Sequence, residues 1–561
     1  MTADLELQTA AQTPSGPARV VDRALSRLLR LPPVRNDIRI ERDVAAAMRD
    51  GVVLLADHYI PVTASPRGVI LIRTPYGRGF PADLLDARVL AARGYHVLFQ
   101  SCRGTFGSGG EFDPMVHEAD DAQDTVVWLR ERPWFDGRLA TLGGSYMGWV
   151  QWALMLDPPP ELRTAVVLVG PHDMSEAVYG TGAFTLNDFL SWSEMVGRQE
   201  QVGRLQGVLR TGTSRRRLEP AFTGLPVADA AQRVLDRSAP WFDAWLSHPD
   251  RSDPFWRRLQ ADDALQRATV PIRLVGGWQD LFLHQTVHQY EVLHSRGVDV
   301  GLTIGPWTHL HVGTRGAGRV VRGNLEWLDQ HLGGEQAVRR APVEVYVTGA
   351  DTWRELPEWP PPTTTDVRFL QPGGRLTPDE PTGAGPSSSF YYHPSDPTPS
   401  LGGRLLTTEA GVRDNRELEA RPDVLTFTTP PLDTALEIVG APVVELVHSR
   451  DNPYADVFLR LCDVDPKGAS RNFADAYRRL DPTTPPNQLQ RLELRLDPCA
   501  HRLERGHRLR LQVSGGAHPR LARNEGIGTP ARCSADLRPC IHTVSHAPGV
   551  ASRVVLPVTA G

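Results

Sequence analysis

The chain has 561 residues, of which 40% are hydrophobic and 23% are charged, and its net charge is −5. A chain of this length exceeds what one hydrophobic core supports, so several domains are expected. The near-balanced charge, without a basic stripe interleaved with aromatic residues, argues against a nucleic-acid-binding protein. No apolar stretch is long enough to cross a membrane, and no signal peptide is recognisable at the start, so a cytoplasmic protein is predicted.

The N-terminal part contains two predicted regions before any chemistry-bearing motif. Residues 1–34 are expected to form a tail with a short helix near 21–31. Two apolar or alternating runs, at 37–43 and 51–60, then indicate antiparallel strands.

From Gly68 the pattern changes to strands alternating with helices. The apolar runs lie at 69–73, 95–100, 139–142 and 164–169, and the helical patterns lie at 82–93, 118–131 and 146–156. Continuous apolar strands separated by helices predict a parallel sheet that is covered on both faces.

This alternation is interrupted once and then ends. Residues 172–267 have helical periodicity and many tryptophans, which predicts an inserted helical cap over the carboxyl edge of the sheet. The runs 272–275 and 301–304 resume the sheet, helices are expected at 284–296 and 324–332, and from 341 short β runs alternate with Pro, Gly and Asp turns. The last part, which begins with the run Val343–Thr348, predicts a β-sandwich or jelly roll.

The predicted division is therefore an N-terminal tail (1–34), an α/β domain in two pieces (35–171 and 268–340), a helical cap (172–267) and a jelly-roll domain (341–561). The jelly roll is expected to be structural rather than catalytic.

The stretch around Ser145 is typical of a strand, a sharp turn and a helix. The corner reads Gly143-Gly144-Ser145, between an apolar run and a helical pattern. A serine at such a turn is lifted above the sheet edge, and small neighbours are needed because the turn is tight. This is the geometry of a nucleophile elbow; a glycine-rich turn with an ordinary capping serine is the alternative.

A serine nucleophile needs a histidine base and a carboxylate that fixes the histidine. In doubly wound hydrolases these residues follow in the order Ser, acid, His, each at the carboxyl end of a strand. Asp280 comes after the run 272–275, and His309 comes after the run 301–304. Alone, Asp280 could be a helix cap and His309 a surface histidine, but their order and placement favour a triad. His311 is a rival base that spacing alone does not exclude.

The oxyanion of acyl transfer needs two hydrogen-bond donors. One is expected from the backbone amide of Tyr146, the residue after the nucleophile. The second is expected from the loop after the first central strand, where Tyr76 offers a hydroxyl or an amide. A surface turn tyrosine without a catalytic role is the alternative.

Together, these segments resemble the CocE/NonD hydrolases, the cocaine esterase-like and X-Pro dipeptidyl-peptidase-like group of α/β-hydrolases. The segments that carry the resemblance are Arg73–Tyr76, Arg103–Phe112, Gly143–Gly148, Gly277–Asp280, Gly305–His309, Gly349–Arg354, Ala455–Val457 and Gly506–Leu509. They cover nearly everything after about residue 37. The family often has an Asp before the Arg-Gly pair, where this chain reads Gln100-Ser101-Cys102-Arg103, and Gln279 replaces the usual aromatic residue beside the acid.

The resemblance implies an α/β-hydrolase core with a helical cap and a C-terminal jelly roll. It implies a triad of Ser145, Asp280 and His309, so it favours His309 over His311, and it implies that the hydroxyl of Tyr76 joins the amide of Tyr146 in the oxyanion hole. The predicted function is a serine hydrolase that cleaves ester or amide bonds of small molecules or short peptides through an acyl-enzyme, without a metal or cofactor.

Two alternatives stay open at this point. An Xaa-Pro dipeptidyl-peptidase would need an anionic site for the substrate's amino terminus, which Glu176, Asp188 or Glu194 could supply. A non-catalytic protein that binds through its jelly roll is the other. The sequence also leaves open whether Cys533 and Cys540 pair and whether the chain forms a homodimer.

Overall fold

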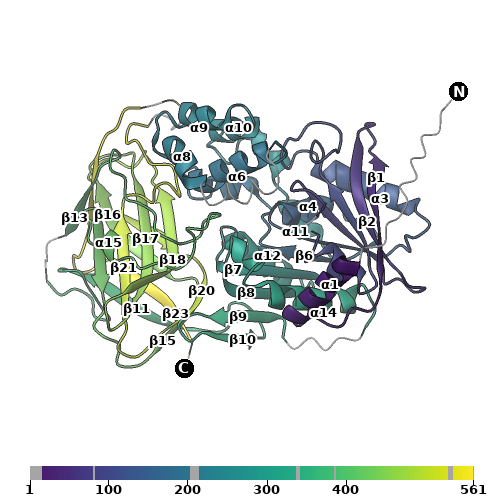
Figure 1. The fold of residues 1–561 in the computed structure, drawn as a ribbon. Coiled ribbons are helices and arrows are strands. Elements are labelled where there is room, and N and C mark those ends of the chain that lie inside the picture. The colour runs from purple at the N-terminus through teal and green to yellow at the C-terminus, as the bar shows by residue number, and fades with distance from the viewer. Residues whose placement is uncertain are drawn as a thin grey trace.

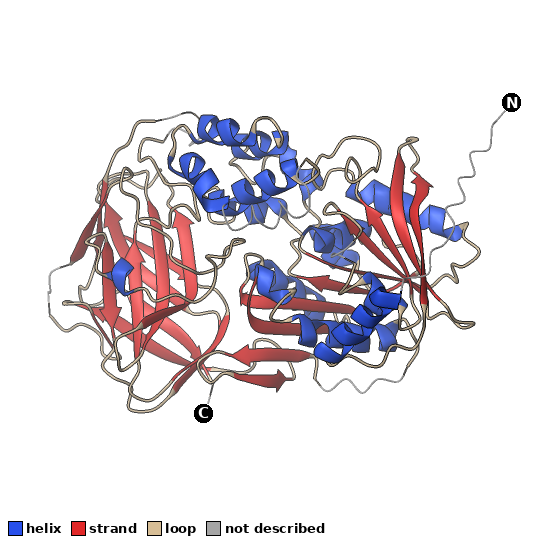
Figure 2. Ribbon diagram, in the orientation of Figure 1, coloured by secondary structure: helices blue, strands red, loops and turns tan. Residues whose placement is uncertain are grey.

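A computed structural model describes residues 16–79, 83–201, 214–335, 341–383, 387–528, 533 and 535–559. Two large β-sheets and a group of helices make up this part of the chain (Figures 1 and 2). In Figure 1 the first sheet lies on the right and in the centre, the second sheet lies on the left, and the helices α6, α8, α9 and α10 lie across the top.

The first sheet has ten strands in the order β1-β2-β4-β3-β5-β6-β7-β8-β9-β10. Neighbours from β4 to β9 pair in parallel, and the pairs at both edges are antiparallel. The strands are β1 (Ile38–Ala47), β2 (Val53–Pro61), β3 (Val69–Thr74), β4 (His96–Ser101), β5 (Leu139–Gly144), β6 (Leu162–Leu168), β7 (Ile272–Gln279), β8 (Val300–Thr308), β9 (Val343–Val347) and β10 (Thr352–Leu356). This confirms the predicted α/β-hydrolase type of sheet.

Helices cover both faces of this sheet because successive strand residues point to opposite sides. In β3, Leu71 packs into a core with α3 and α12, whereas Ile70 and Ile72 pack into a second core with α2 and α14. The helices of this part are α1 (Gly16–Leu28), α2 (Ala87–Ala91), α3 (Glu118–Arg130), α4 (Tyr146–Leu154), α12 (Leu283–Ser295), α13 (His309–Val312) and α14 (Ala317–His331).

The described residues of the segment between β6 and β7 are largely helical, as predicted. The segment contains α5 (Met174–Tyr179), α6 (Leu186–Arg198), α8 (Ser214–Thr223), α9 (Val227–Leu235), α10 (Pro240–Ser247), the 3-10 helix η1 (Pro254–Leu259) and α11 (Asp262–Arg267). Its tryptophans Trp192, Trp241, Trp245 and Trp256 are buried in one apolar cluster with residues of α4. The tryptophans that break the α/β pattern in the sequence therefore form the core that attaches these helices to the sheet.

The C-terminal part is β-rich and contains a second sheet of thirteen strands. These are β11 (Thr364–Gln371), β12 (Arg375–Thr377), β13 (Ser388–Tyr392), β14 (Val424–Thr428), β15 (Leu436–Gly440), β16 (Val443–Arg450), β17 (Asp456–Val464), β18 (Ser470–Arg479), β19 (Gln490–Arg495), β20 (Cys499–Leu503), β21 (Arg508–Ser514), β22 (Cys540–Val544) and β23 (Arg553–Val558), with one short helix, α15 (Arg416–Glu419). Their alternating apolar residues form a separate core.

Several predicted element bounds were wrong. The run at Val343 was expected to open the jelly roll, but β9 pairs with β8 and extends the first sheet, because the crossover through α14 returns the chain to that edge. The helix expected at 82–93 is α2, which spans only 87–91, and residues 80–82 lie outside the described part. The helix expected at 324–332 begins seven residues earlier, at Ala317.

The described residues also show the state of two cysteines and the character of the helices. Cys533 and Cys540 are both free thiols. No helix in this part of the chain combines the length and the apolar character that a membrane-spanning helix requires.

Candidate active site

Ser145 lies at a strained turn between β5 and α4. Its φ of 59° and ψ of −124° place a non-glycine residue in a region that L-amino acids rarely adopt. The flanking glycines are required by space: a Cβ on Gly143 would lie 2.4 Å from the Cβ of Met147, and one on Gly148 would lie 2.6 Å from the Cα of Gly170. This backbone has the form of a nucleophile elbow rather than of an ordinary capped helix, because the Ser145 side chain makes no cap hydrogen bond.

Asp280 and His309 meet at the carboxyl ends of two neighbouring parallel strands. β7 ends at Gln279 and β8 ends at Thr308, so each residue directly follows its strand. Nδ1 of His309 lies 2.6 Å from Oδ1 of Asp280, and Asp280 is completely buried. The other carboxylate oxygen accepts a hydrogen bond from the amide of Phe282 at 3.1 Å.

The rival histidine, His311, is placed differently. It is partly exposed, and burial together with the charges of Arg315 and Arg413 lowers its pKa. The carboxylate partner that orients a base is therefore found at His309. Ser145 and His309 line the same pocket.

Tyr76 brings its hydroxyl to this pocket from the loop after β3. Nε1 of Trp192, on α6, donates a hydrogen bond to this hydroxyl at 3.0 Å. Burial raises the pKa of Tyr76 to about 12, although hydrogen bonds with Trp192 and with Ser145 act in the opposite direction. The phenol is thus neutral at neutral pH and keeps its proton for donation beside the serine. The amide of Tyr146 is the first of α4 and has no intrahelical acceptor.

The pocket at Ser145 is small and mostly apolar, with a volume of about 30 Å³. The residues that line it are Tyr76, Met115, Ser145, Tyr146, Pro171, Met174, Asp188, Phe189, Trp192, Leu281, Phe282, His309 and Leu406. Leu406 belongs to the C-terminal part, so a loop of this part supplies one wall of the pocket.

Of the three carboxylates considered as an anionic site, only Asp188 lines this pocket. Its Oδ1 accepts hydrogen bonds from the amide of Leu406 at 2.9 Å and from Nδ2 of Asn187 at 3.0 Å. Burial raises the pKa of Asp188. Glu194 instead pairs with Arg217 at 3.1 Å, and Glu176 pairs with Arg251 at 2.6 Å.

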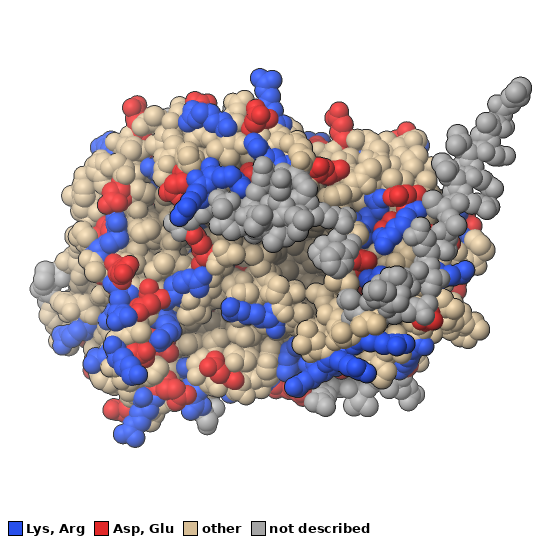
Figure 3. Space-filling model, viewed as in Figure 1, with Lys and Arg blue, Asp and Glu red and all other residues tan. Residues whose placement is uncertain are grey.

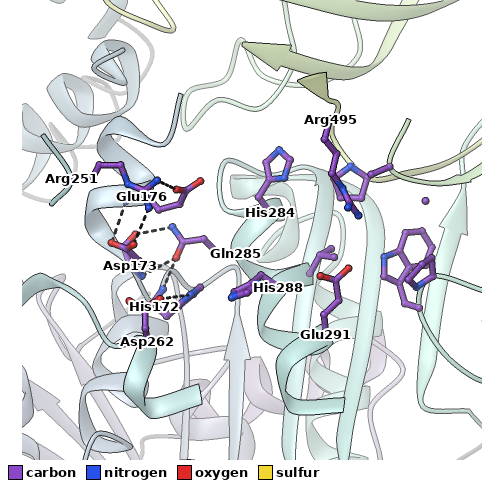
Figure 4. Close-up of a pocket in the computed structure, with 16 residues that line it drawn as sticks. His172, Asp173, Glu176, Arg251, Asp262, His284, Gln285, His288, Glu291 and Arg495 are labelled. Atoms are coloured by element: carbon purple, nitrogen blue, oxygen red, sulfur yellow. Dashed lines mark hydrogen bonds and ion pairs between the residues drawn. The ribbon is translucent and has the colours of Figure 1, made fainter. Parts of the chain in front are cut away.

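A larger cavity of about 350 Å³ lies beside α12 and contains none of the triad residues (Figure 4). In Figure 4, Arg251 forms ion pairs with both Asp173 and Glu176, and Gln285 forms hydrogen bonds with both Asp173 and His172. Burial lowers the pKa of His172 to about 4, so this ring is neutral at neutral pH. Volume alone would favour this cavity, but Tyr76, Ser145 and His309 all line the smaller one.

Among the described residues, no group of three or more His, Cys, Asp or Glu side chains is arranged to hold a metal ion. On the face shown in Figure 3, basic and acidic side chains are interspersed, and the surface is hollowed near its centre.

The residues that sequence reasoning missed are those on the pocket walls. Trp192 was noted only as one of many tryptophans, and Leu406 was not considered at all. Neither lies in a motif, because each is brought to the pocket by long-range packing rather than by a local turn.

Comparisons with known proteins agree with this architecture. Family models match residues 50–311 to X-Pro dipeptidyl-peptidase (S15 family) and residues 336–555 to the X-Pro dipeptidyl-peptidase C-terminal non-catalytic domain. Cocaine esterase from Rhodococcus sp. (strain MB1 Bresler) is 28% identical over 94% of this chain and 99% of its own length.

Solved structures are similar over the same span. An alpha-amino acid ester hydrolase is 26% identical, with a TM-score of 0.78 over 94% of this chain and 98% of its own. An aminopeptidase from the marine sediment archaeon Thaumarchaeota archaeon has a TM-score of 0.80 over the same shares at 23% identity, a likeness of fold alone.

Proposed function

We propose the chemistry of this chain from one premise: it belongs to the CocE/NonD family of α/β-hydrolases and is a serine hydrolase of carboxylic ester or amide bonds. We assign Ser145 as the nucleophile, His309 as the base and Asp280 as the acid of the triad. We assign the Tyr76 hydroxyl and the Tyr146 amide to the oxyanion hole. The observation that carries these assignments is the 2.6 Å contact of His309 with Asp280 in the pocket that also holds Ser145 and Tyr76.

The reaction proceeds through an acyl-enzyme. Ser145 Oγ attacks the carbonyl carbon while Nε2 of His309 takes its proton, and Asp280 holds the ring and stabilises the imidazolium. The two donors bind the oxyanion. When the tetrahedral intermediate collapses, His309 gives the proton to the leaving alcohol or amine. His309 then activates a water molecule, which releases the acid and restores Ser145.

The dimensions of the pocket favour esters with a small apolar acyl group. A cavity of about 30 Å³ beside Ser145, lined by aromatic and aliphatic side chains, has little room for the acyl part of a dipeptide. The non-catalytic alternative is set aside, since the family is one of serine hydrolases.

A substrate panel tests this proposal directly. We expect the protein to cleave p-nitrophenyl acetate and butyrate with a far higher kcat/KM than any Xaa-Pro-p-nitroanilide, and Ser145→Ala to abolish both activities. Preferential cleavage of the Xaa-Pro anilides would reject the ester assignment but keep the triad. Residual ester cleavage in Ser145→Ala would reject the triad.

Asp188 favours a second candidate, an acyl group with an ammonium next to the carbonyl. Asp188 is the carboxylate of the pocket outside the triad, and its Oδ2 accepts no hydrogen bond from the described residues. A cation there would compensate its buried charge. The similar alpha-amino acid ester hydrolase is consistent with this candidate.

A matched pair of esters tests the role of Asp188. We expect alanine methyl ester to be cleaved faster than methyl propionate, and Asp188→Asn to remove this preference while the rate with methyl propionate stays within about threefold. An unchanged ratio of the two kcat/KM values in Asp188→Asn would reject the ammonium site.

The remaining sequence predictions also stay proposals. We propose that residues 35–171 and 268–340 form the catalytic unit together with β9 and β10, that 172–267 form its cap, and that the rest of 341–561 forms the jelly roll. Cell fractionation tests the predicted cytoplasmic location, and light scattering tests whether the chain forms a homodimer.

A further inference from the structure

A single buried carboxylate, Glu118, connects the two loops that carry the oxyanion donors. It is the first residue of α3 and is 3% exposed. Its Oε1 accepts a hydrogen bond from the hydroxyl of Tyr146 at 2.7 Å, and its Oε2 lies 2.8 Å from Nη1 of Arg73. The same Nη1 also donates to the backbone carbonyl of Glu118 at 2.9 Å.

Each partner of Glu118 is close in sequence to one donor. Tyr146 directly follows Ser145, and its own amide is the backbone donor. Arg73 is the penultimate residue of β3 and precedes Thr74 and Pro75, which lead to Tyr76. A displacement of Glu118 would therefore displace both donors, although Glu118 does not line the pocket.

The hydroxyl of Tyr146 is held by two hydrogen bonds inside the protein, one donated and one accepted. It donates to Glu118 and accepts from the amide of Met115 at 2.9 Å. Burial, followed by the charge of Glu118, raises its pKa well above the ordinary value, so it stays protonated. Its ring stacks on Trp192 and meets Tyr76 edge-on. A ring held at both its polar end and its faces fixes the backbone to which it is attached.

The charges around Arg73 explain why a carboxylate is needed at position 118. Arg73 is buried, and the residue that accepts from its Nε is Gln100, which is neutral. Asp121 lies 3.7 Å from its Nη2, but Asp121 also forms an ion pair with Arg103 at short range. Glu118 is thus the nearest anion to Arg73, and removal of its charge would leave a buried guanidinium poorly compensated.

We propose that Glu118 is a positioning residue for the oxyanion hole: by binding Tyr146 and Arg73 together, it sets the distance between the Tyr146 amide and the Tyr76 hydroxyl. Oxyanion donors act only when they lie about 2.7–3.1 Å from the developing charge, and a displacement of about 1 Å can cost about 100-fold in rate. The inference rests on the proposed assignment of Tyr76 and Tyr146 as donors.

Tyr146→Phe and Glu118→Gln test the proposal. Tyr146→Phe keeps the amide and the ring but breaks the link to Glu118, and Glu118→Gln keeps the volume but removes the charge. We expect kcat per active site, titrated with a fluorophosphonate, to fall at least tenfold in each variant, with KM changed less than threefold. Tyr95→Phe, which removes a hydroxyl that lies just before β4 and is bonded to Asp329 of α14, is the matched control and should keep kcat.

A transition-state analogue separates positioning from a general loss of structure. We expect the affinity for a trifluoromethyl ketone, which forms a tetrahedral adduct with an oxyanion, to fall in parallel with kcat/KM, while the affinity for the carboxylate product stays the same. Combining Glu118→Gln with Tyr76→Phe should cost less than the product of the two single losses, because Glu118 acts partly through Tyr76.

Two outcomes overturn the inference, and they differ from a failure of the proposed function. If both variants keep kcat per active site within twofold of wild type, Glu118 does not position the donors. If kcat falls but the affinity for the trifluoromethyl ketone does not, its role lies outside the oxyanion hole. If Glu118→Gln does not fold, Tyr146→Phe still decides. A silent Tyr76→Phe would instead reject the donor assignment on which the inference rests.

Discussion

The strand ends of the first sheet and the walls of the pocket are built in opposite ways. Ser145, Asp280 and His309 each follow a parallel strand directly, so the sheet alone brings them to one edge. Asp188 and Leu406 come from a helix of the inserted segment and a loop of the C-terminal part, 218 residues apart, and one hydrogen bond joins them. The residues of the proposed triad are therefore placed by local sequence, whereas the walls of the pocket are assembled by long-range packing.

The largest expected effect comes from the strand ends. Ser145→Ala and His309→Ala should each lower kcat by about 10⁴-fold or more, because the triad acts as a unit. His311→Ala should leave kcat nearly unchanged. Steady-state kinetics with p-nitrophenyl acetate, and circular dichroism to confirm folding, measure both. If His311→Ala lowers kcat and His309→Ala does not, the base is His311, and it is not the residue that directly follows β8.

The proposed oxyanion hole lies where the two regions meet, since Tyr76 follows a strand but receives its hydrogen bond from Trp192 of α6. Tyr76→Phe removes a bond that is strongest in the transition state, so kcat should fall about 100- to 1,000-fold while KM changes little. A loss of less than threefold would show that the amide, not the hydroxyl, of residue 76 is used.

The contact between helix α12 and the C-terminal part should be sensitive to pH. Asp497 lies 2.8 Å from both Nε of Arg404 and Nε2 of His284. Burial would raise the pKa of Asp497, but the charges of Arg404 and His284 outweigh it and hold that pKa below the usual range. Its stabilisation is therefore present above the unfolded-state pKa of about 3.9 and is lost as the pH falls towards the folded-state value.

Asp497→Asn tests this linkage. At pH 7 the variant should be less stable by about 3–5 kcal/mol, the usual cost of removing one partner of a buried pair. The difference from wild type should shrink as the pH falls below about 4, as measured by urea unfolding. Glu131→Gln, in an exposed ion pair with Arg132, should show neither effect. A pH-independent difference would mean that Asp497 stabilises by packing rather than by charge.

The smallest effect is expected at the pocket wall. Leu406→Ala leaves its backbone amide on Asp188 but removes most of an apolar side chain beside Ser145. We expect the ratio of kcat/KM for p-nitrophenyl hexanoate over acetate to rise by about tenfold, the scale of a few methylene groups in such a pocket. An unchanged ratio would place the acyl group elsewhere.

The same difference explains what could be predicted from the sequence. The residues of the proposed triad could be predicted from the sequence, because an elbow needs Gly143 and Gly148 and because Asp280 and His309 stand directly after apolar runs. The hydrogen bond from Trp192 to Tyr76 could not, because several tryptophans of the inserted segment have similar surroundings in the sequence. The edge strand β9 was assigned to the wrong sheet, because five alternating residues fit either sheet equally well.

The loop that carries Asp280 also has a consequence for the order of synthesis. The carbonyl of Leu281 accepts from Nη1 of Arg404, and His284 pairs with Asp497, which is 213 residues later in the chain. At about 5–20 residues per second, the ribosome needs roughly 10–40 s to make that stretch. All three residues of the proposed triad are thus made well before Arg404 and Asp497, which hold the loop of Asp280. We therefore expect the nascent chain to gain full hydrolytic activity only after Arg404 and Asp497 have been made.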